Sequence, residues 1–254
     1  MKSLILILLS GILLYFGAVI YLYVTQDNKI FNRKWAKPYE PTIAKKITFK
    51  TSDGIVLEGA YIENGKNLPL VLYFSGNANN VIEFVDKTAS KIKHYNFIGF
   101  NYPGYAGSKG KPCEKCILKY ALEIFDKYKP EIIIGRSLGS AVAAYVASKR
   151  KIKKLVLITP FDSIVNIAKS RYPFLPVEKL VKYKFNEVKW IKNIKAPVNV
   201  LLVKNDNVVP QKNISNLLKN IKNLNKKTVV SGIKHGNIYE YKNFNKILTE
   251  LLNQ

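Results

Sequence analysis

The chain has 254 residues, enough for one large α/β domain with an appendage, and 48% of them are hydrophobic. Its formal net charge of +24 would suit a nucleic-acid partner. However, arginine occurs only at positions 33, 136, 150 and 171, and phosphate and base recognition favours the arginine fork. We therefore expect no nucleic-acid partner, and the lysines favour an anionic membrane surface or an acidic partner.

The first predicted element is an apolar helix near the N-terminus. Residues Leu4–Val24 carry no charge, and such a segment, rising ~1.5 Å per residue, spans ~30 Å, about one hydrocarbon core. The alternative, a cleaved signal peptide, has an apolar run of only ~7–15 residues, and it ends in small residues where Tyr21 and Tyr23 stand here. We predict a transmembrane anchor over 1–25, a linker over 26–42 and a folded domain over 43–254. The lysines leave the side of the membrane open.

Beyond the linker, the pattern predicts strands that alternate with helices. Segments 43–51 and 55–62 alternate in polarity around Ser52-Asp53-Gly54, which is typical of a β-hairpin. Continuous apolar runs predict buried strands at 69–74, 97–101, 131–134, 155–159, 198–203 and 228–231. Helical patterns occur at 80–93, 114–128, 138–149, 211–222 and 238–252. This order predicts a mostly parallel sheet covered by helices on both faces, with catalytic groups at the carboxyl ends of the strands.

The most informative stretch follows the strand predicted at 131–134. The apolar run ends in Gly135-Arg136-Ser137-Leu138-Gly139, and small helix-forming residues come next. A strand, a sharp Gly-x-Ser-x-Gly turn and a helix form a nucleophile elbow, in which the serine Oγ is held at the helix N-terminus. The alternative is an ordinary glycine-rich turn. We predict that Ser137 is a catalytic nucleophile.

A serine nucleophile needs a base, and the chain has only two histidines. His94 ends a predicted helix and is typical of a surface position. His235 follows the last predicted strand, in a loop where a catalytic base would stand. We therefore predict that His235 is the base.

The base in turn needs a carboxylate to orient it, and two candidates follow predicted strands. Asp206 follows the strand at 198–203, and its rival Asp162 follows the strand at 155–159, where it would instead cap a helix. The order Ser137, Asp206, His235 is that of α/β-hydrolases, so we favour Asp206.

An oxyanion hole needs a second backbone N–H near that of Leu138. The loop Phe74–Ala78, after the first parallel strand, has the right place in the chain. We predict that the amides of Asn77 and Leu138 form the hole. The alternative is a plain strand-to-helix loop.

Several further motifs point to one family. The stretch 72–80, Leu-Tyr-Phe-Ser-Gly-Asn-Ala-Asn-Asn, resembles the His-Gly-Asn-Ala-Gly-Asn stretch of a branch of α/β-hydrolases, and 101–112 resembles its Tyr-Arg-Gly-Tyr-Gly loop. The motifs at 159–163, 172–176, 205–210 and 234–237 also match. This branch contains membrane-tethered hydrolase-domain proteins and serine-aminopeptidase-like hydrolases. One departure is Ser75, which stands where the family usually has histidine.

The resemblance implies an α/β-hydrolase fold with a small lid, preceded by one transmembrane helix. It also implies a serine hydrolase that acts by acyl transfer on an ester, thioester or amide, without metal or organic cofactor. The predicted lid lies between Pro160 and Pro197, with Tyr172, Phe174, Leu175 and Leu180 as candidate apolar wall residues. A small-molecule or lipid-like acyl substrate is expected, cleaved at a carboxylester or thioester. A peptidase, a non-catalytic binding protein on this fold and a basic surface binder are the alternatives.

Cys113 and Cys116 form an isolated Cys-x-x-Cys pair. Three interpretations stay open: a helix-borne pair without a ligand role, a disulfide in an oxidising compartment, and metal binding. We favour the first, because the chain has no second pair to complete a zinc site.

Overall fold

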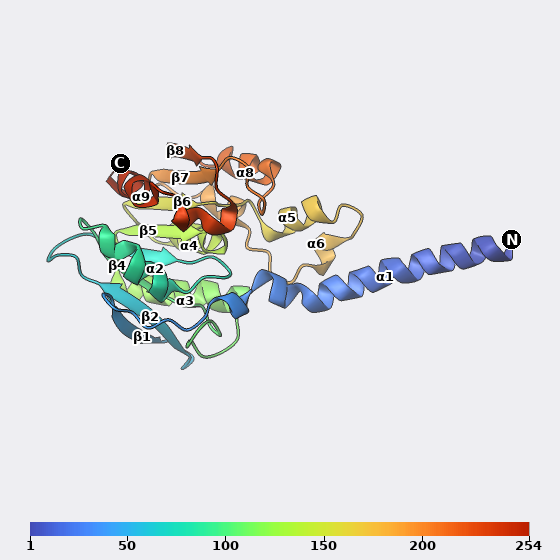
Figure 1. Cartoon of the computed structure of the whole chain (residues 1–254), viewed down its shortest axis with the longest axis horizontal. Helices are drawn as coiled ribbons and strands as arrows, with labels where there is room; N and C mark the ends of the chain where they lie inside the picture. The colour runs from blue at the N-terminus through green and yellow to red at the C-terminus, as the bar shows by residue number, and fades with distance from the viewer. Residues whose placement is uncertain (254) are drawn as a thin grey trace.

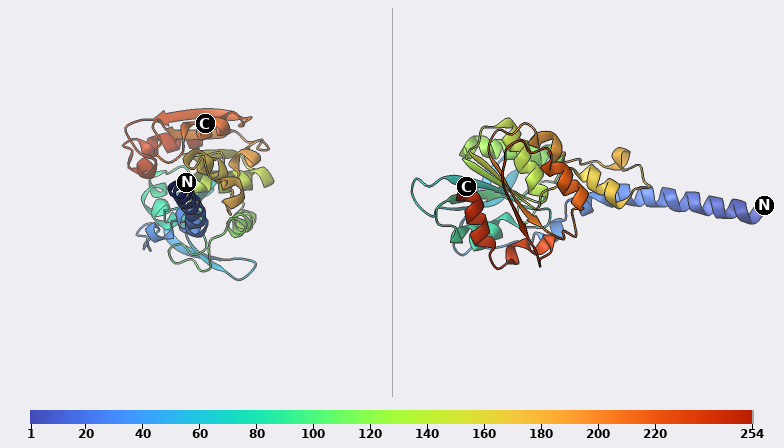
Figure 2. Two further views of the ribbon diagram at one scale, coloured as in Figure 1. Left: turned by 90° about the vertical axis from the view of Figure 1, so that its right-hand side faces the viewer. Right: turned by 90° about the horizontal axis from the view of Figure 1, so that it is seen from above.

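The computed structural model describes residues 1–253 and shows a long N-terminal helix attached to an α/β domain (Figures 1 and 2). Within these residues, eight strands form one sheet in the order β1-β2-β4-β3-β5-β6-β7-β8. The pairs β1/β2 and β2/β4 are antiparallel, and the other pairs are parallel, so the predicted mostly parallel sheet is confirmed. The strands are β1 Lys45–Lys50, β2 Val56–Ile62, β3 Leu70–Phe74, β4 Asn96–Phe100, β5 Ile132–Arg136, β6 Lys154–Ile158, β7 Val198–Val203 and β8 Leu224–Val230.

Helices cover both faces of the sheet, because alternate side chains of the central strands point to opposite sides. Leu155 and Leu157 of β6 belong to one apolar cluster with residues of α3, α4 and α8, whereas Val156 and Ile158 belong to a second cluster with α2 and α9. Because both faces of the central strands are buried, these strands are mostly apolar. The helices are α2 Val81–Lys87, η2 Ala89–Lys91, α3 Glu114–Tyr128, α4 Leu138–Lys149, α8 Gln211–Leu218 and α9 Phe244–Asn253.

Two elements differ clearly from their sequence predictions. Strand β8 begins at Leu224 rather than residue 228, and its early residues are polar because it is an exposed edge strand. The last α-helix begins at Phe244 rather than residue 238, because the preceding segment folds as the short 3₁₀ helix η3 (His235–Glu240). Both differences arise where tertiary packing, and not the apolar pattern, decides the local structure.

The segment between β6 and β7 forms the small lid. It contains three short helices, α5 (Ile164–Arg171), α6 (Val177–Leu180) and α7 (Glu187–Ile191). Helix α7 packs on α4, whereas α5 and α6 project from the domain beside the N-terminal helix (Figures 1 and 2).

The N-terminal helix α1 (Lys2–Ile30) is apolar and long enough to cross a membrane, and its most apolar stretch is unburied. The helix continues past residue 25 into the segment predicted as a linker, and the 3₁₀ helix η1 (Arg33–Trp35) follows it. Gln26 and Phe31 are buried against the domain, so the end of α1 is bound rather than free. The division of the chain at residues 25 and 42 stays a prediction.

The segment between η1 and β1 is held by one carboxylate, Asp86 of α2. Its Oδ1 accepts hydrogen bonds from the backbone N–H groups of Thr42, Ile43 and Ala44, and its Oδ2 accepts from the hydroxyls of Tyr39 and Thr42. Burial raises the pKa of Asp86, but these hydrogen bonds outweigh burial and lower the pKa to about 2. Asp86 therefore ties the incoming chain to the sheet.

We predict that Asp86→Asn lowers the free energy of unfolding by roughly 2 kcal/mol at neutral pH, because hydrogen bonds to a charged group are lost. The folded pKa lies below the unfolded value of about 4, so this stabilisation is present above that pH and is lost as the pH falls toward 2. Chemical denaturation of the full chain in detergent measures it. Glu83→Gln, an exposed change on the same helix, is the control, and equal losses for both variants would contradict the prediction.

Candidate active site

Ser137 occupies the sharp turn between β5 and α4. Its backbone has φ 49° and ψ −118°, a conformation that residues other than glycine rarely adopt. The turn is tight because Gly135 and Gly139 lack side chains: a Cβ on Gly139 would lie 2.2 Å from the carbonyl oxygen of Phe74, and one on Gly135 would lie 2.3 Å from that of Gly139. The predicted strand, turn and helix are therefore all present, with Ser137 at the turn.

The structure brings together the three residues predicted as nucleophile, base and acid. His235 Nε2 lies 2.9 Å from Ser137 Oγ, and His235 Nδ1 lies 2.7 Å from Asp206 Oδ2. Ser137 follows β5, Asp206 follows β7 and His235 follows β8, so each comes from the carboxyl end of a parallel strand. This geometry permits a proton to pass from the hydroxyl to the imidazole while the carboxylate orients the ring.

Local electrostatics keep the imidazole neutral and the carboxylate ionised. Burial and the nearby charge of Arg136 lower the pKa of His235 below its ordinary value, although the hydrogen bond with Asp206 opposes this shift. Burial raises the pKa of Asp206, but its hydrogen bonds with His235 and with the N–H groups of Val208 and Val209 outweigh burial and lower the pKa. A neutral histidine beside an ionised aspartate is the protonation state that a general base requires.

The rival carboxylate, Asp162, lies in a different environment. Its oxygens accept hydrogen bonds from the amides of Asn166, Asn213 and Asn216 and from the N–H of Ser163. It does not cap α5 through its own side chain, because Ser163 is the N-cap residue of that helix. Asp162 instead links α5 to α8 and has no hydrogen bond to His235 among the described residues.

Asn77 and Leu138 line the same cavity as Ser137, as the predicted oxyanion hole requires. Two tyrosines hold the loop that carries Asn77. The hydroxyl of Tyr105 donates to the carbonyl of Asn77, and that of Tyr102 donates to the carbonyl of Ser75. Ser75, at the usual family histidine position, is buried. Tyrosine hydroxyls therefore support the backbone of this loop.

The sequence patterns did not assign Arg136 a functional role, yet its buried side chain joins the two loops of the site. One guanidinium nitrogen donates to Asn79 Oδ1 at 2.8 Å, and another donates to the backbone carbonyl of His235 at 2.8 Å. The cation also lies over the ring of Tyr239. The signal in the sequence was a charged residue at the end of an otherwise apolar strand. Arg136 is a positioning residue for the base.

A buried carboxyl group, Glu187 of α7, supports the elbow from the lid side. Ser140 Oγ lies 2.6 Å from both the carbonyl oxygen of Ser137 and Oε2 of Glu187. A hydroxyl has one proton to donate, so both contacts are hydrogen bonds only when Glu187 is protonated. Burial raises the pKa of Glu187 well above its ordinary value, in agreement with this state. A neutral Glu187 adds no negative charge beside the elbow.

Ser137 lines a cavity of about 200 Å³, which lies between the carboxyl ends of the central strands, the lid and α1. Tyr172 and Leu180 line it as predicted, whereas Phe174 is 89% exposed and neither it nor Leu175 is a lining residue. The predictions for these two wall residues are therefore wrong. The cavity wall is mostly apolar, with Leu22, Ile30, Phe161, Ile164, Ile167, Val177, Val181, Val208 and Val209.

Comparison with known proteins identifies the family. A model of the alpha/beta hydrolase fold family matches residues 69–198. This chain belongs to the alpha/beta hydrolase fold family. The match confirms the resemblance predicted from the sequence motifs, and relatives of this hydrolase include an alpha/beta hydrolase domain-containing protein of Arabidopsis thaliana and an uncharacterized membrane protein of Saccharomyces cerevisiae.

Three relatives of this alpha/beta hydrolase illustrate the similarity. An uncharacterized protein of Mycobacterium tuberculosis is 31% identical over 175 residues, 65% of this chain and 62% of that protein. An uncharacterized membrane protein of Saccharomyces cerevisiae is 30% identical over 58% of this chain and 50% of its own length. The lysophosphatidylserine lipase ABHD12 of Rattus norvegicus is 29% identical over 57% of this chain and 43% of its own length. The matched stretches thus span less than two thirds of these relatives.

Solved structures agree on the fold of this alpha/beta hydrolase. The Pyrococcus furiosus esterase Pf2001 superposes with a TM-score of 0.63 at 20% identity, and the match covers 85% of this chain and 98% of the esterase. The shared fold places the carboxyl ends of the strands at one edge, which is where Ser137, Asp206 and His235 meet.

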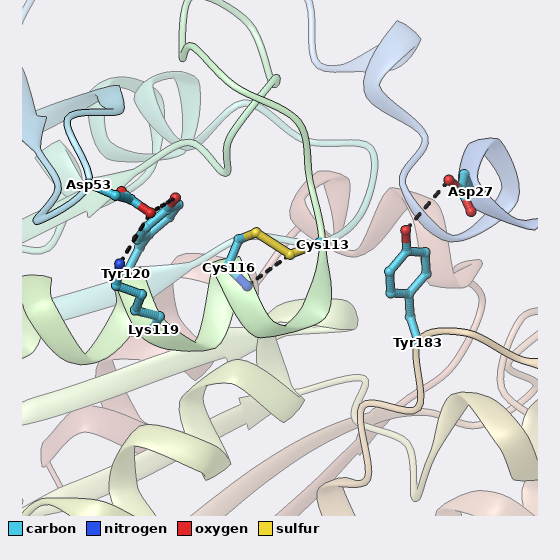
Figure 3. The surroundings of a disulfide bond; sticks show 7 residues. All are labelled: Asp27, Asp53, Cys113, Cys116, Lys119, Tyr120 and Tyr183. Atoms are coloured by element: carbon cyan, nitrogen blue, oxygen red, sulfur yellow. Dashed lines mark hydrogen bonds and ion pairs between the residues drawn. A yellow bond between two sulfur atoms is a disulfide. The ribbon is translucent and has the colours of Figure 1, made fainter.

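The two cysteines of this hydrolase are joined as a disulfide at the start of α3 (Figure 3). Cys113 is also the N-cap of α3, and its sulfur accepts from the backbone N–H of Cys116. Of the three interpretations left open, the structure has the disulfide rather than the favoured helix-borne pair without a ligand role, because the helical turn brings the two side chains within bonding distance.

We predict that His235 titrates below the ordinary histidine pKa of about 6.5, because burial and Arg136 disfavour the imidazolium. In a His94→Asn background one imidazole remains, and its signal is followed by NMR against pH. Arg136→Met raises the midpoint, since it removes a repelling charge. Arg150→Met, which breaks an ion pair with Asp126, is the control and leaves the midpoint in place. An unchanged midpoint in Arg136→Met would contradict the assignment.

Proposed function

We propose that this chain is a serine hydrolase that acts by acyl transfer. The observation that carries the proposal is the position of His235, whose two ring nitrogens lie within hydrogen-bond distance of Ser137 Oγ and Asp206 Oδ2. The strained backbone of Ser137 and its place at the N-terminus of α4 support the same role.

In the proposed reaction, Ser137 Oγ attacks the substrate carbonyl while its proton moves to His235 Nε2. The N–H groups of Asn77 and Leu138 stabilise the negative oxygen of the tetrahedral intermediate. The imidazolium then donates this proton to the leaving alcohol or thiol, and an acyl-enzyme is left. Water, deprotonated by His235, attacks the acyl-enzyme and releases the acid and Ser137.

The proposed substrate is a carboxylester or thioester that carries an acyl chain. The mostly apolar cavity beside Ser137 suits such a chain, and a lipase and an esterase among the similar proteins are in agreement. Of the described residues that line the cavity, Lys29 and Arg171 carry a charge, and both are cationic. This sign favours a substrate with an anionic head group.

Two alternatives remain as outcomes of experiment. An aminopeptidase-like amide hydrolase shares the triad, and it would cleave aminoacyl amides while ignoring p-nitrophenyl acyl esters of every chain length. A non-catalytic binding protein shares the fold, and it would not react with a fluorophosphonate probe.

We also propose that α1 anchors the protein in a membrane as a single span. Large apolar side chains on this helix are exposed along most of its length, for example Leu13 at 73% and Leu14 at 75%. A lipid bilayer is the environment in which an unburied apolar helix of this length is stable.

We predict that a fluorophosphonate probe labels the wild-type chain and does not label Ser137→Ala. Asp206→Asn lowers kcat for an acyl ester by roughly 10³–10⁴, because the imidazole loses its orienting carboxylate. Asp162→Asn is the matched control and has a far smaller effect, since Asp162 has asparagine partners instead. Gel fluorescence and ester hydrolysis measure these effects. Labelling that persists in Ser137→Ala would refute the assignment of the nucleophile.

We predict that the full chain resists extraction from membranes by alkaline carbonate. Leu13→Arg increases the extracted fraction, because an arginine in the middle of the span costs about 2.5–3.5 kcal/mol. Asn28→Arg, beyond the apolar run, is the control and keeps the wild-type fraction. If Leu13→Arg and wild type were extracted equally, α1 would not be the anchor.

A further inference from the structure

The end of the apolar helix α1 is part of the wall of the cavity that contains Ser137. Leu22, Gln26, Lys29 and Ile30 all line this cavity. Their spacing of three and four residues places them on one face of the helix. The remaining wall comes from the lid and from the loops after the strands, so the cavity lies between α1 and the domain.

The lid is fastened to α1 by a buried amide. Gln26 Nε2 donates to the carbonyl of Leu180 at 3.0 Å, and Gln26 Oε1 accepts from the backbone N–H of Lys182 at 2.8 Å. Gln26 is 8% exposed, so both halves of the amide are used in an environment largely closed to water. The glutamine thus fixes the distance between the helix and the end of α6.

Charged and aromatic contacts extend this attachment along the chain. The hydroxyl of Tyr183 donates to Asp27 at 3.5 Å (Figure 3), and Lys182 Nζ lies 3.5 Å from the same carboxylate. Phe31 packs edge-on against the ring of Tyr183. The end of α1 is therefore built into the lid.

The same helix end also contacts the oxyanion loop. The side-chain amide of Asn77 donates to the carbonyl of Lys29 at 3.5 Å. One helix thus contacts the lid and the loop proposed to bind the oxyanion, and it lines the space between them.

The position of these residues relative to the apolar segment points to the route of the substrate. Leu22 lies inside the apolar run that ends at Val24, and Ile30 is only ~12 Å further along the helix axis. If α1 spans a bilayer, the cavity begins at the boundary of the hydrocarbon layer. The cavity of about 200 Å³ is smaller than typical pockets of ~300–1,000 Å³, so it favours a single acyl chain over a two-chain lipid.

We infer that α1 is both the membrane anchor and a specificity-determining wall of the acyl site, along which a single-chain ester lipid passes directly from the bilayer to Ser137. This inference rests on the proposed hydrolase function. Leu22 and Ile30 would contact the acyl chain, while Gln26 keeps the lid in place. A substrate with no chain to bury would gain nothing from this wall.

The test compares two alkyl fluorophosphonates, one with an ethyl group and one with a long chain, on the full protein in phosphatidylcholine vesicles. Both react by the same chemistry at Ser137, so the ratio of their labelling rates reports chain binding alone. Leu22→Trp places an indole in the cavity, and we expect it to lower the long-to-short ratio by about tenfold. Val24→Trp, on the same helix but 67% exposed, is the matched control and keeps the wild-type ratio.

A ratio that stays within about twofold of wild type in Leu22→Trp would overturn the inference, and labelling by the short probe shows that the variant is folded. If neither probe labels wild-type Ser137, the proposed hydrolase function fails instead, and the two failures are thereby distinguished.

Delivery from the bilayer is tested by placing the long-chain probe in the vesicles that hold the protein or in separate vesicles. Exchange of the probe between vesicles is measured independently. We expect labelling to start at once in shared vesicles and to lag by the exchange time from separate ones. Equal time courses under slow exchange would overturn delivery along α1.

Discussion

The close approach of three backbone segments around Ser137 is the constraint on which the site depends. The carbonyl of Phe74 at the end of β3 lies where a side chain on Gly139 would stand, and Gly139 in turn lies against Gly135. This contact brings the elbow beside the loop that carries Asn77, so nucleophile and oxyanion donors face one cavity. The strain at Ser137, with φ 49°, is sustained because β5 and α4 are anchored in the two apolar clusters.

Around this turn, polar side chains in a dry environment fix the other parts of the site. Arg136 joins the carbonyl of His235 to Asn79, and it also makes the imidazolium less favourable. Glu187 supports the elbow through Ser140 and is held neutral by burial. Because Arg136 is cationic and Glu187 is neutral, neither side chain opposes the negative charge that develops at the proposed oxyanion. Arg136 and Glu187 thus both position the residues of the site and set the charge around them.

The N-terminal helix α1 is both the candidate membrane span and part of the wall of the cavity that contains Ser137. Its first turns are exposed and apolar, and its last turns are bound to the lid through Gln26 and Asp27. An enzyme whose acyl site is completed by its own anchor would select substrates by where they reside as well as by their structure. The cationic lining residues Lys29 and Arg171 agree with an anionic membrane surface beside the cavity.

The sequence alone determined the features that local patterns encode. Alternating and continuous apolar runs predicted the sheet, and α3 and α4 begin and end where the helical periodicity indicated. Only two histidines were available, so the candidate base followed almost by elimination. Only the tertiary structure decided between Asp206 and Asp162 as the partner of His235, because both follow strands and their distances to the imidazole are not encoded locally. It likewise decided that Arg136, Glu187 and the end of α1 belong to the site, since each acts through contacts between segments far apart in the chain.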